Sequence, residues 1–123
     1  MNIAALIVDD QLDMQMLIRL TLEFANDGLT VSRTVSSGAE ALDVIEEVDP
    51  TVVVLDEMMP GLSGVETATW IRRSRPHQRI VLCSAYIDES VRDRAALAGI
   101  RACVPKDHLA ELPDTLRRVA AND

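Results

Sequence analysis

The stretch of residues 51–61, with the sequence TVVVLDEMMPG, constrains the fold of this chain more than any other. Three Val residues and a Leu lead without interruption to Asp56, and Pro60 and Gly61 follow shortly after it. β-Branched side chains favour strands, and a continuous apolar run is typical of a strand buried on both faces of a parallel sheet. The pattern therefore predicts a central strand with Asp56 at its carboxyl end, where open α/β sheets bind their ligands.

Strands and helices are predicted to alternate along the whole chain. Apolar or alternating runs predict strands over residues 3–8, 30–35, 51–55, 79–84 and 101–104, and helical spacing with capping residues predicts helices over 12–25, 39–48, 65–73, 88–98 and 112–120. Such alternation indicates a parallel sheet with helices on both faces and right-handed crossovers. We therefore expect an α/β fold in which residues 1–123 form a single domain.

Composition argues against several functional classes. The net charge is −8 and no run of Lys or Arg occurs, which disfavours direct binding to nucleic acid, because phosphate neutralisation needs a basic patch. The N-terminus lacks the basic segment of a signal peptide, and no apolar stretch approaches the length of a membrane span. We therefore expect a cytoplasmic protein without a membrane partner. Cys83 and Cys103 lie in apolar runs without CxxC spacing, and we interpret them as reduced, buried side chains.

Polar side chains follow four of the predicted strands at the point where each strand ends. Asp9 and Asp10 follow the first strand, Asp56 the third, Ser84 closes the fourth, and Lys106 follows the fifth. Parallel strands share a direction, so these residues are expected at one edge of the sheet. The strand order 2-1-3-4-5, common in doubly wound sheets, would place strands one and three side by side and the three aspartates in one cleft.

Three clustered carboxylates repel one another, so a cation is expected to offset their charge. Mg²⁺ prefers a few carboxylates, a carbonyl and several waters, whereas zinc is disfavoured because His77 and His108 lie in predicted loops. A metal beside a carboxylate, with an ammonium and a hydroxyl nearby, suits phosphoryl transfer. The carboxylate would attack and the other groups would stabilise the phosphoryl oxygens, which would give an acyl phosphate.

The chain resembles the response-regulator receiver domains of bacterial two-component signalling. The resemblance covers essentially all 123 residues and rests on four motifs in matching order and spacing: VDD at residues 8–10, LDEMMPG at 55–61, SA at 84–85, and Lys106. It implies a flavodoxin-like fold with five helices and a five-stranded parallel sheet of order 2-1-3-4-5, an order for which a member of this family is itself a standard example. Residues 1–123 would then be one receiver domain.

The resemblance also implies a role for each residue of the metal site. Asp10 and Asp56 would bind Mg²⁺ together with the backbone carbonyl of Met58, and Asp9 would act partly through a bound water. Asp56 would also be the acceptor of a phosphoryl group from a histidine kinase or a phosphotransfer protein. The domain would phosphorylate and dephosphorylate itself without turning over an external substrate.

The remaining implied roles concern the response to phosphorylation. Lys106 would pair with the phosphoryl group, and Ser84 would move toward it. This movement would couple phosphorylation to the face formed by helix four, strand five and helix five, by which the domain would control an output domain or effector protein. A homodimer through the same face is a further possibility that the resemblance raises.

Three positions depart from the family pattern. Cys103 stands where the family usually has Tyr or Phe. Lys106 is preceded by Pro105 and followed by Asp, which resembles regulators with helix-turn-helix outputs, and the sequence leaves open whether the bond before Pro105 is cis. Glu57 adds a negative charge after Asp56, and we interpret it as an outward-pointing, solvated side chain. We interpret the charged residues 88–94 in the same way, as a solvated helix face.

Two other functions compete with the switch. A pseudo-receiver would be an interaction module that never carries phosphate, and the altered end of strand five leaves room for it. A phosphatase of the haloacid dehalogenase type also uses a strand-end Asp with Mg²⁺, but it needs a second Asp two residues later. Met58 stands at that position, which argues against the phosphatase.

Overall fold

The computed structural model describes residues 2–25 and 27–122, and strands alternate with helices throughout them. The elements in order are β1 (Ile3–Val8), α1 (Leu12–Ala25), β2 (Leu29–Val35), α2 (Gly38–Val48), β3 (Val52–Leu55), α3 (Gly64–Ser74), β4 (Arg79–Ser84), α4 (Glu89–Leu97), β5 (Ala102–Pro105), the 3₁₀ helix η1 (Lys106–Glu111) and α5 (Leu112–Ala121). The predicted strands and α-helices are confirmed, with boundaries that agree to within one residue, and η1 is an addition that the sequence did not predict.

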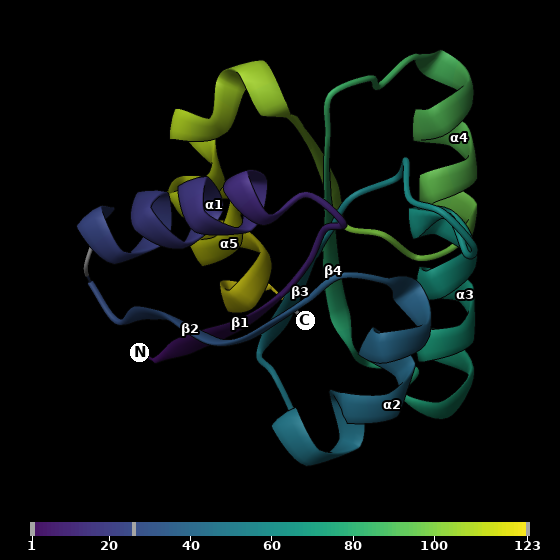
Figure 1. Ribbon diagram of the computed structural model, residues 1–123, viewed down its shortest axis with the longest axis horizontal. Coiled ribbons are helices and arrows are strands. Elements are labelled where there is room, and N and C mark those ends of the chain that lie inside the picture. The colour runs from purple at the N-terminus through teal and green to yellow at the C-terminus, as the bar shows by residue number, and fades with distance from the viewer. Residues whose placement is uncertain (1, 26, 123) are drawn as a thin grey trace.

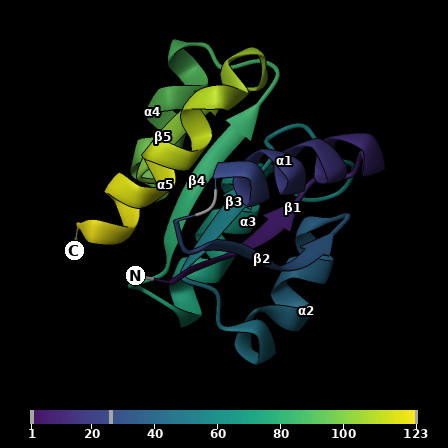
Figure 2. The same cartoon turned by 90° about the vertical axis from the view of Figure 1, so that its left-hand side faces the viewer.

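All strand pairs are parallel, and the sheet has the order β2-β1-β3-β4-β5. Helices α1 and α5 cover one face, and α2, α3 and α4 cover the other (Figure 1). The view turned by 90°, toward α1 and α5, shows the strands running in one direction (Figure 2). This architecture confirms the predicted flavodoxin-like α/β fold with five α-helices.

Burial of the strands on both faces explains why their apolar runs are unbroken. Ile7 packs into the core beneath α1 and α5, whereas its neighbours Leu6 and Val8 pack into the core beneath α2, α3 and α4. In β3 all four residues, Val52–Leu55, are buried in the same alternating way. Helices on both faces thus bury consecutive residues and leave no solvated side of the central strands.

Helix α1 forms where predicted, but four of its apolar residues do not face the core. Met16, Leu17, Leu20 and Phe24 are exposed, and Phe24 is 85 % exposed. The buried side chains of α1 are Gln15, Ile18 and Leu22, which also recur at helical spacing. Because apolar residues occupy nearly the whole circumference of this helix, periodicity identifies the helix without identifying its buried side.

Capping side chains set the starts of three helices. Ser37 accepts from the backbone N–H of Glu40 at the start of α2, and Asp88 accepts from Val91 at the start of α4. Ser63 and Glu66 form a reciprocal capping box at the start of α3. Each cap satisfies a backbone N–H group that would lack a partner within the first turn of its helix.

The end of β5 is regular despite its unusual sequence. Among the described residues no peptide bond is cis, so the bond before Pro105 is trans. Pro105 pairs with Ser84 in the register of β4 and β5, at the outer strand of the sheet, where proline is tolerated. Cys83 is buried and Cys103 half-buried, and both are free thiols. Burial raises the pKa of the Cys83 thiol to about 12, which fits the interpretation of an inert side chain.

Candidate functional site

The sheet brings the predicted acidic residues together at its carboxyl edge. Val8 and Leu55 are register partners at the ends of β1 and β3, and Asp9 and Asp56 each follow one of them. The backbone N–H of Asp56 donates to the carbonyl of Val8 over 3.0 Å, which extends the ladder into the site. Asp9 and Asp56 are buried and Asp10 is exposed, and one carboxylate oxygen from each lies within 4.8 Å of the others. The predicted three-aspartate cluster therefore forms.

Lys106 approaches this cluster from the end of β5, the outer strand of the sheet. It is the first residue after β5, and its Nζ lies 2.8 Å from Oδ2 of Asp9 and 3.2 Å from Oδ2 of Asp56. The Lys106 side chain is only 12 % exposed, so the ammonium is largely removed from water. One cation is thus shared by two buried carboxylates, and Asp10 stands at the solvent side of the cluster.

Ser84 ends β4 within the same edge and is completely buried. Its hydroxyl makes no well-formed hydrogen bond to any described residue, although it is near enough to Asp56 to help lower the pKa of that carboxyl. A buried hydroxyl without a partner is costly, so Ser84 has hydrogen-bonding capacity that no described residue uses.

The three carboxylates of the cluster share only the one ammonium of Lys106 as a contacting cation among the described residues, so negative charge is in excess. Burial raises the pKa of Asp56, Lys106 lowers it and Asp9 raises it, and the net result lies above the ordinary value. Burial alone lowers the pKa of Lys106, but the hydrogen bond to Asp9 and the charges of Asp56 and Asp9 outweigh it, so this pKa is raised. Hard oxygen ligands with excess negative charge fit a Mg²⁺ ion better than a softer metal.

The loop after Asp56 is held against α3. The backbone N–H of Gly64 donates to the carbonyl of Glu57, and a side chain at Gly64 would place Cβ only 2.4 Å from the carbonyl oxygen of Asp56. Glycine is therefore required where α3 begins. The Met58 side chain is 70 % exposed, and the proposed role of its backbone carbonyl as a metal ligand stays a prediction.

Gln15 supports the site and was not singled out from the sequence. Its side-chain amide donates to the backbone carbonyl of Asp9 over 2.7 Å and lies 3.2 Å from the carbonyl of Val35 and from Oγ of Ser36. It therefore ties α1 to the ends of β1 and β2. The available signal was its helical spacing with Ile18, which places a polar residue on the buried side of α1.

The interpretation of Glu57 as a solvated side chain was wrong. Glu57 is buried, its Oε1 accepts from the backbone N–H of Val65 over 2.8 Å, and its Oε2 lies 3.5 Å from Nη1 of Arg94. A carboxylate at the start of α3 is stabilised by the free N–H groups of that helix. The residues 88–94 are accordingly not a purely solvated face, since Asp88 caps α4 and Arg94 pairs with Glu57.

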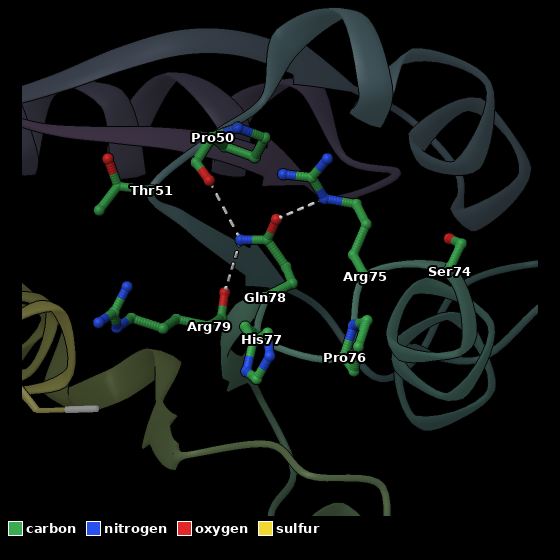
Figure 3. A pocket seen from close by; sticks show the side chains of 8 residues that line it. All are labelled: Pro50, Thr51, Ser74, Arg75, Pro76, His77, Gln78 and Arg79. Atoms are coloured by element: carbon green, nitrogen blue, oxygen red, sulfur yellow. Dashed lines mark hydrogen bonds between the residues drawn. The ribbon is translucent and has the colours of Figure 1, made fainter.

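A surface pocket of about 390 Å³ lies at the opposite edge of the sheet, before β3 and β4, and its polar groups pair with one another and with neighbouring residues. The Gln78 side chain donates to the carbonyls of Pro50 and Arg79 and accepts from Nε of Arg75 (Figure 3). Arg75 in turn forms ion pairs with Glu46 and with Asp49. These contacts brace the amino ends of the strands, away from the acidic cluster.

Comparison with known proteins agrees with the fold. Residues 5–117 match the family model described as the response regulator receiver domain, so the chain belongs to that family. It is 30 % identical over 101 residues to the chemotaxis protein CheY of Thermotoga maritima, covering 82 % of each chain. It is 33 % identical over 96 residues to the response regulator GacA of Pseudomonas syringae, covering 77 % of this chain and 45 % of GacA.

Solved structures extend the likeness. The response regulator domain of Thermotoga maritima CheB superposes with a TM-score of 0.92 at 24 % identity, covering 100 % of this chain and 99 % of that one. A LuxR-family two-component response regulator from Aurantimonas superposes with a TM-score of 0.93 at 25 % identity, covering 98 % of this chain and 86 % of that one. The prediction of a response-regulator receiver is thereby confirmed. No helix in the described part of the chain has the length and apolar character needed to span a membrane.

Proposed function

We propose that this receiver is a phosphorylation switch in which Asp56 accepts a phosphoryl group from a histidine kinase or a phosphotransfer protein. The observation that carries the proposal is the contact of the buried Asp56 carboxylate with the Lys106 ammonium beside Asp9 and Asp10. Asp56 would be the nucleophile, Lys106 the cation and the aspartates the oxygen ligands, all at the carboxyl edge of the sheet.

The proposed reaction transfers one phosphoryl group between two side chains. An oxygen of Asp56 attacks phosphorus, the bond from phosphorus to the donor's histidine nitrogen breaks, and its electron pair stays on the imidazole. Lys106 then offsets charge on the phosphoryl oxygens, and the unpaired Ser84 hydroxyl donates a hydrogen bond to one of them.

The acidic cluster would hold the metal ion that this reaction needs. Asp9, Asp10 and Asp56 provide the carboxylates, with Asp9 acting partly through water, and the carbonyl of Met58 completes the proposed protein ligands. A bound Mg²⁺ would neutralise charge on the transferred group. The domain would phosphorylate and dephosphorylate itself without turning over an external substrate, and would thus be a switch rather than a turnover enzyme.

The apolar surface of α1 supports an interaction with a protein phosphodonor. Helix α1 begins two residues after Asp10, and its side chains Leu12 and Met16 are exposed. Exposed apolar side chains beside a reactive group are typical of a protein-binding surface. We therefore place the kinase or phosphotransfer protein over α1 and the acidic cluster.

The output is proposed to act through α4, β5 and α5. Ser84 leads directly into the segment before α4, so its movement toward the phosphoryl group would shift that helix. Some relatives, such as GacA, are more than twice as long as the matched segment, which fits an attached output domain or a separate effector. The proposal includes a homodimer through this face. It also includes a single receiver domain over residues 1–123 and a cytoplasmic location.

One experiment tests the proposal against its two competitors. The protein is incubated with acetyl phosphate in the presence and absence of Mg²⁺, and its intact mass is measured. We expect one phosphoryl adduct that requires Mg²⁺ and is lost in Asp56→Asn. No adduct on the wild type would favour a pseudo-receiver, and steady hydrolysis of varied phosphomonoesters would favour the phosphatase.

A further inference from the structure

A second buried carboxylate stands immediately after the proposed acceptor. Glu57 accepts the backbone N–H of Val65 with Oε1, and its own backbone carbonyl accepts the N–H of Gly64. Through these two bonds Glu57 fixes the acceptor loop against the start of α3. Its second carboxylate oxygen, Oε2, takes no part in these two bonds and contacts a different helix.

That oxygen faces α4. Oε2 of Glu57 lies 3.5 Å from Nη1 of Arg94, which is half exposed and sits in the last turn of the helix. Only Val91 and Ala95 of α4 are buried, so few apolar contacts fix the position of this helix. The ion pair therefore adds a polar contact to the few apolar contacts that hold α4 against the rest of the molecule.

The Glu57 carboxylate also acts electrostatically on Cys103 of β5. Burial raises the pKa of the Cys103 thiol, the charge of Arg92 lowers it and that of Glu57 raises it, so both charges lie close to Cys103. Cys103 is half-buried and packs beside the core under α4. The charges of Glu57 and Arg92 thus both act on the small Cys103 side chain.

We propose that Glu57 is a positioning residue whose ion pair with Arg94 holds α4 in its unphosphorylated place. The inference rests on the proposed function, because it concerns how phosphorylation of Asp56 reaches α4. Ser84 and the cap residue Asp88 are separated by three residues, so a pull on Ser84 acts on the start of α4 while Arg94 holds its last turn. A contact made in only one arrangement biases the equilibrium toward that arrangement.

The proposal predicts the opposite of simple electrostatics for one variant. Removing the positive charge of Arg94 should weaken binding of any anion at Asp56 if charge alone matters. If the ion pair instead restrains α4, its removal should favour the phosphorylated arrangement and tighten binding. Glu57→Gln keeps an oxygen that can accept from Val65, so this variant removes the ion pair without removing the hydrogen bond to the start of α3.

The test measures the affinity of the full chain for beryllofluoride, a phosphoryl mimic, with saturating Mg²⁺ by isothermal titration calorimetry. We expect Arg94→Gln to bind about two- to fivefold more tightly than wild type, the range of a partly exposed ion pair. Glu57→Gln should also bind more tightly, and the double variant should gain less than the sum of the two. Arg92→Gln, which removes an exposed charge from the same helix, is the matched control and should not tighten binding.

The outcomes separate the inference from the function on which it rests. Unchanged or weaker binding by Arg94→Gln, with normal binding by wild type, would overturn the restraining role of Glu57 and Arg94 alone. Equal tightening in Arg92→Gln would overturn it too, because the effect would then not need the ion pair. Absence of binding by wild type would overturn the phosphorylation switch and this inference together.

Discussion

The Nζ atom of Lys106 lies 2.8 Å from Oδ2 of Asp9, so the end of β5 is joined across the carboxyl edge to the end of β1. The same ammonium contacts Asp56, and all three side chains are largely removed from water. A shared, buried cation of this kind makes the stability of the domain depend on the state of its site.

Replacing Lys106 with Met should destabilise the protein in the absence of metal. Two buried carboxylates would lose their cation, and an uncompensated buried charge costs about 3 kcal/mol. We expect this loss in urea unfolding at neutral pH, and we expect Mg²⁺ to restore part of it by supplying positive charge. Equal stability of Lys106→Met and wild type in metal-free buffer would show that the contact with Asp9 contributes nothing to the free energy of unfolding.

Replacing Asp10 with Asn should weaken Mg²⁺ binding. Asp10 is the exposed member of the cluster, so its loss removes a ligand without disturbing the core. We expect a decrease in affinity on the order of tenfold to a hundredfold, measured by calorimetry. Asp13→Asn is the control, because Asp13 lies in the first turn of α1 outside the cluster and bonds to the neighbouring backbone N–H of Met14. A similar loss in both variants would indicate a general charge effect.

The Asp56 carboxyl should make stability depend on pH. Burial raises its pKa above the ordinary 3.8, so the folded chain binds this proton more tightly than the unfolded chain. The resulting stability is fully present below pH 3.8 and is lost as pH rises through the folded-state pKa. In metal-free buffer Asp56→Asn should therefore raise the melting temperature at neutral pH, and this gain should shrink as the pH is lowered toward 3.8. The exposed Asp43→Asn on α2 should show no such pattern.

The two sides of α1 should respond differently to truncation. Leu22 is completely buried, so Leu22→Ala should cost about 2–5 kcal/mol of unfolding free energy. Leu17 is exposed, and Leu17→Ala should change the unfolding free energy by about 0.5 kcal/mol or less. Chemical denaturation of the two variants measures this difference directly, and similar costs would mean that α1 is oriented otherwise.

The sequence predicts the sheet and the cluster well because both follow from local patterns. Unbroken apolar runs identify the buried strands, and the residue after each run lies at the carboxyl edge in a parallel sheet. Asp9, Asp56 and Lys106 therefore meet although they are distant in the chain. Their order along the sheet came from the resemblance to a known family, since local patterns do not rank neighbouring strands.

The errors arose where burial depends on distant partners. Glu57 has no local feature that separates it from a solvated acid, because its partners Val65 and Arg94 are supplied by α3 and α4. In α1, Gln15 is buried and Phe24 is exposed, the reverse of what their polarity suggests. The amide of Gln15 finds the carbonyl of Asp9, and this contact exists only in the assembled fold.

The central claim is that Asp56, rather than another aspartate of the cluster, carries the phosphoryl group. Borohydride reduces an acyl phosphate on aspartate to homoserine, so peptide mass spectrometry after treatment with acetyl phosphate and Mg²⁺ locates the modified residue. We predict homoserine at position 56 and at no other position. Homoserine at Asp9 or Asp10, or at no position in protein that carries the phosphoryl mass, would contradict the account.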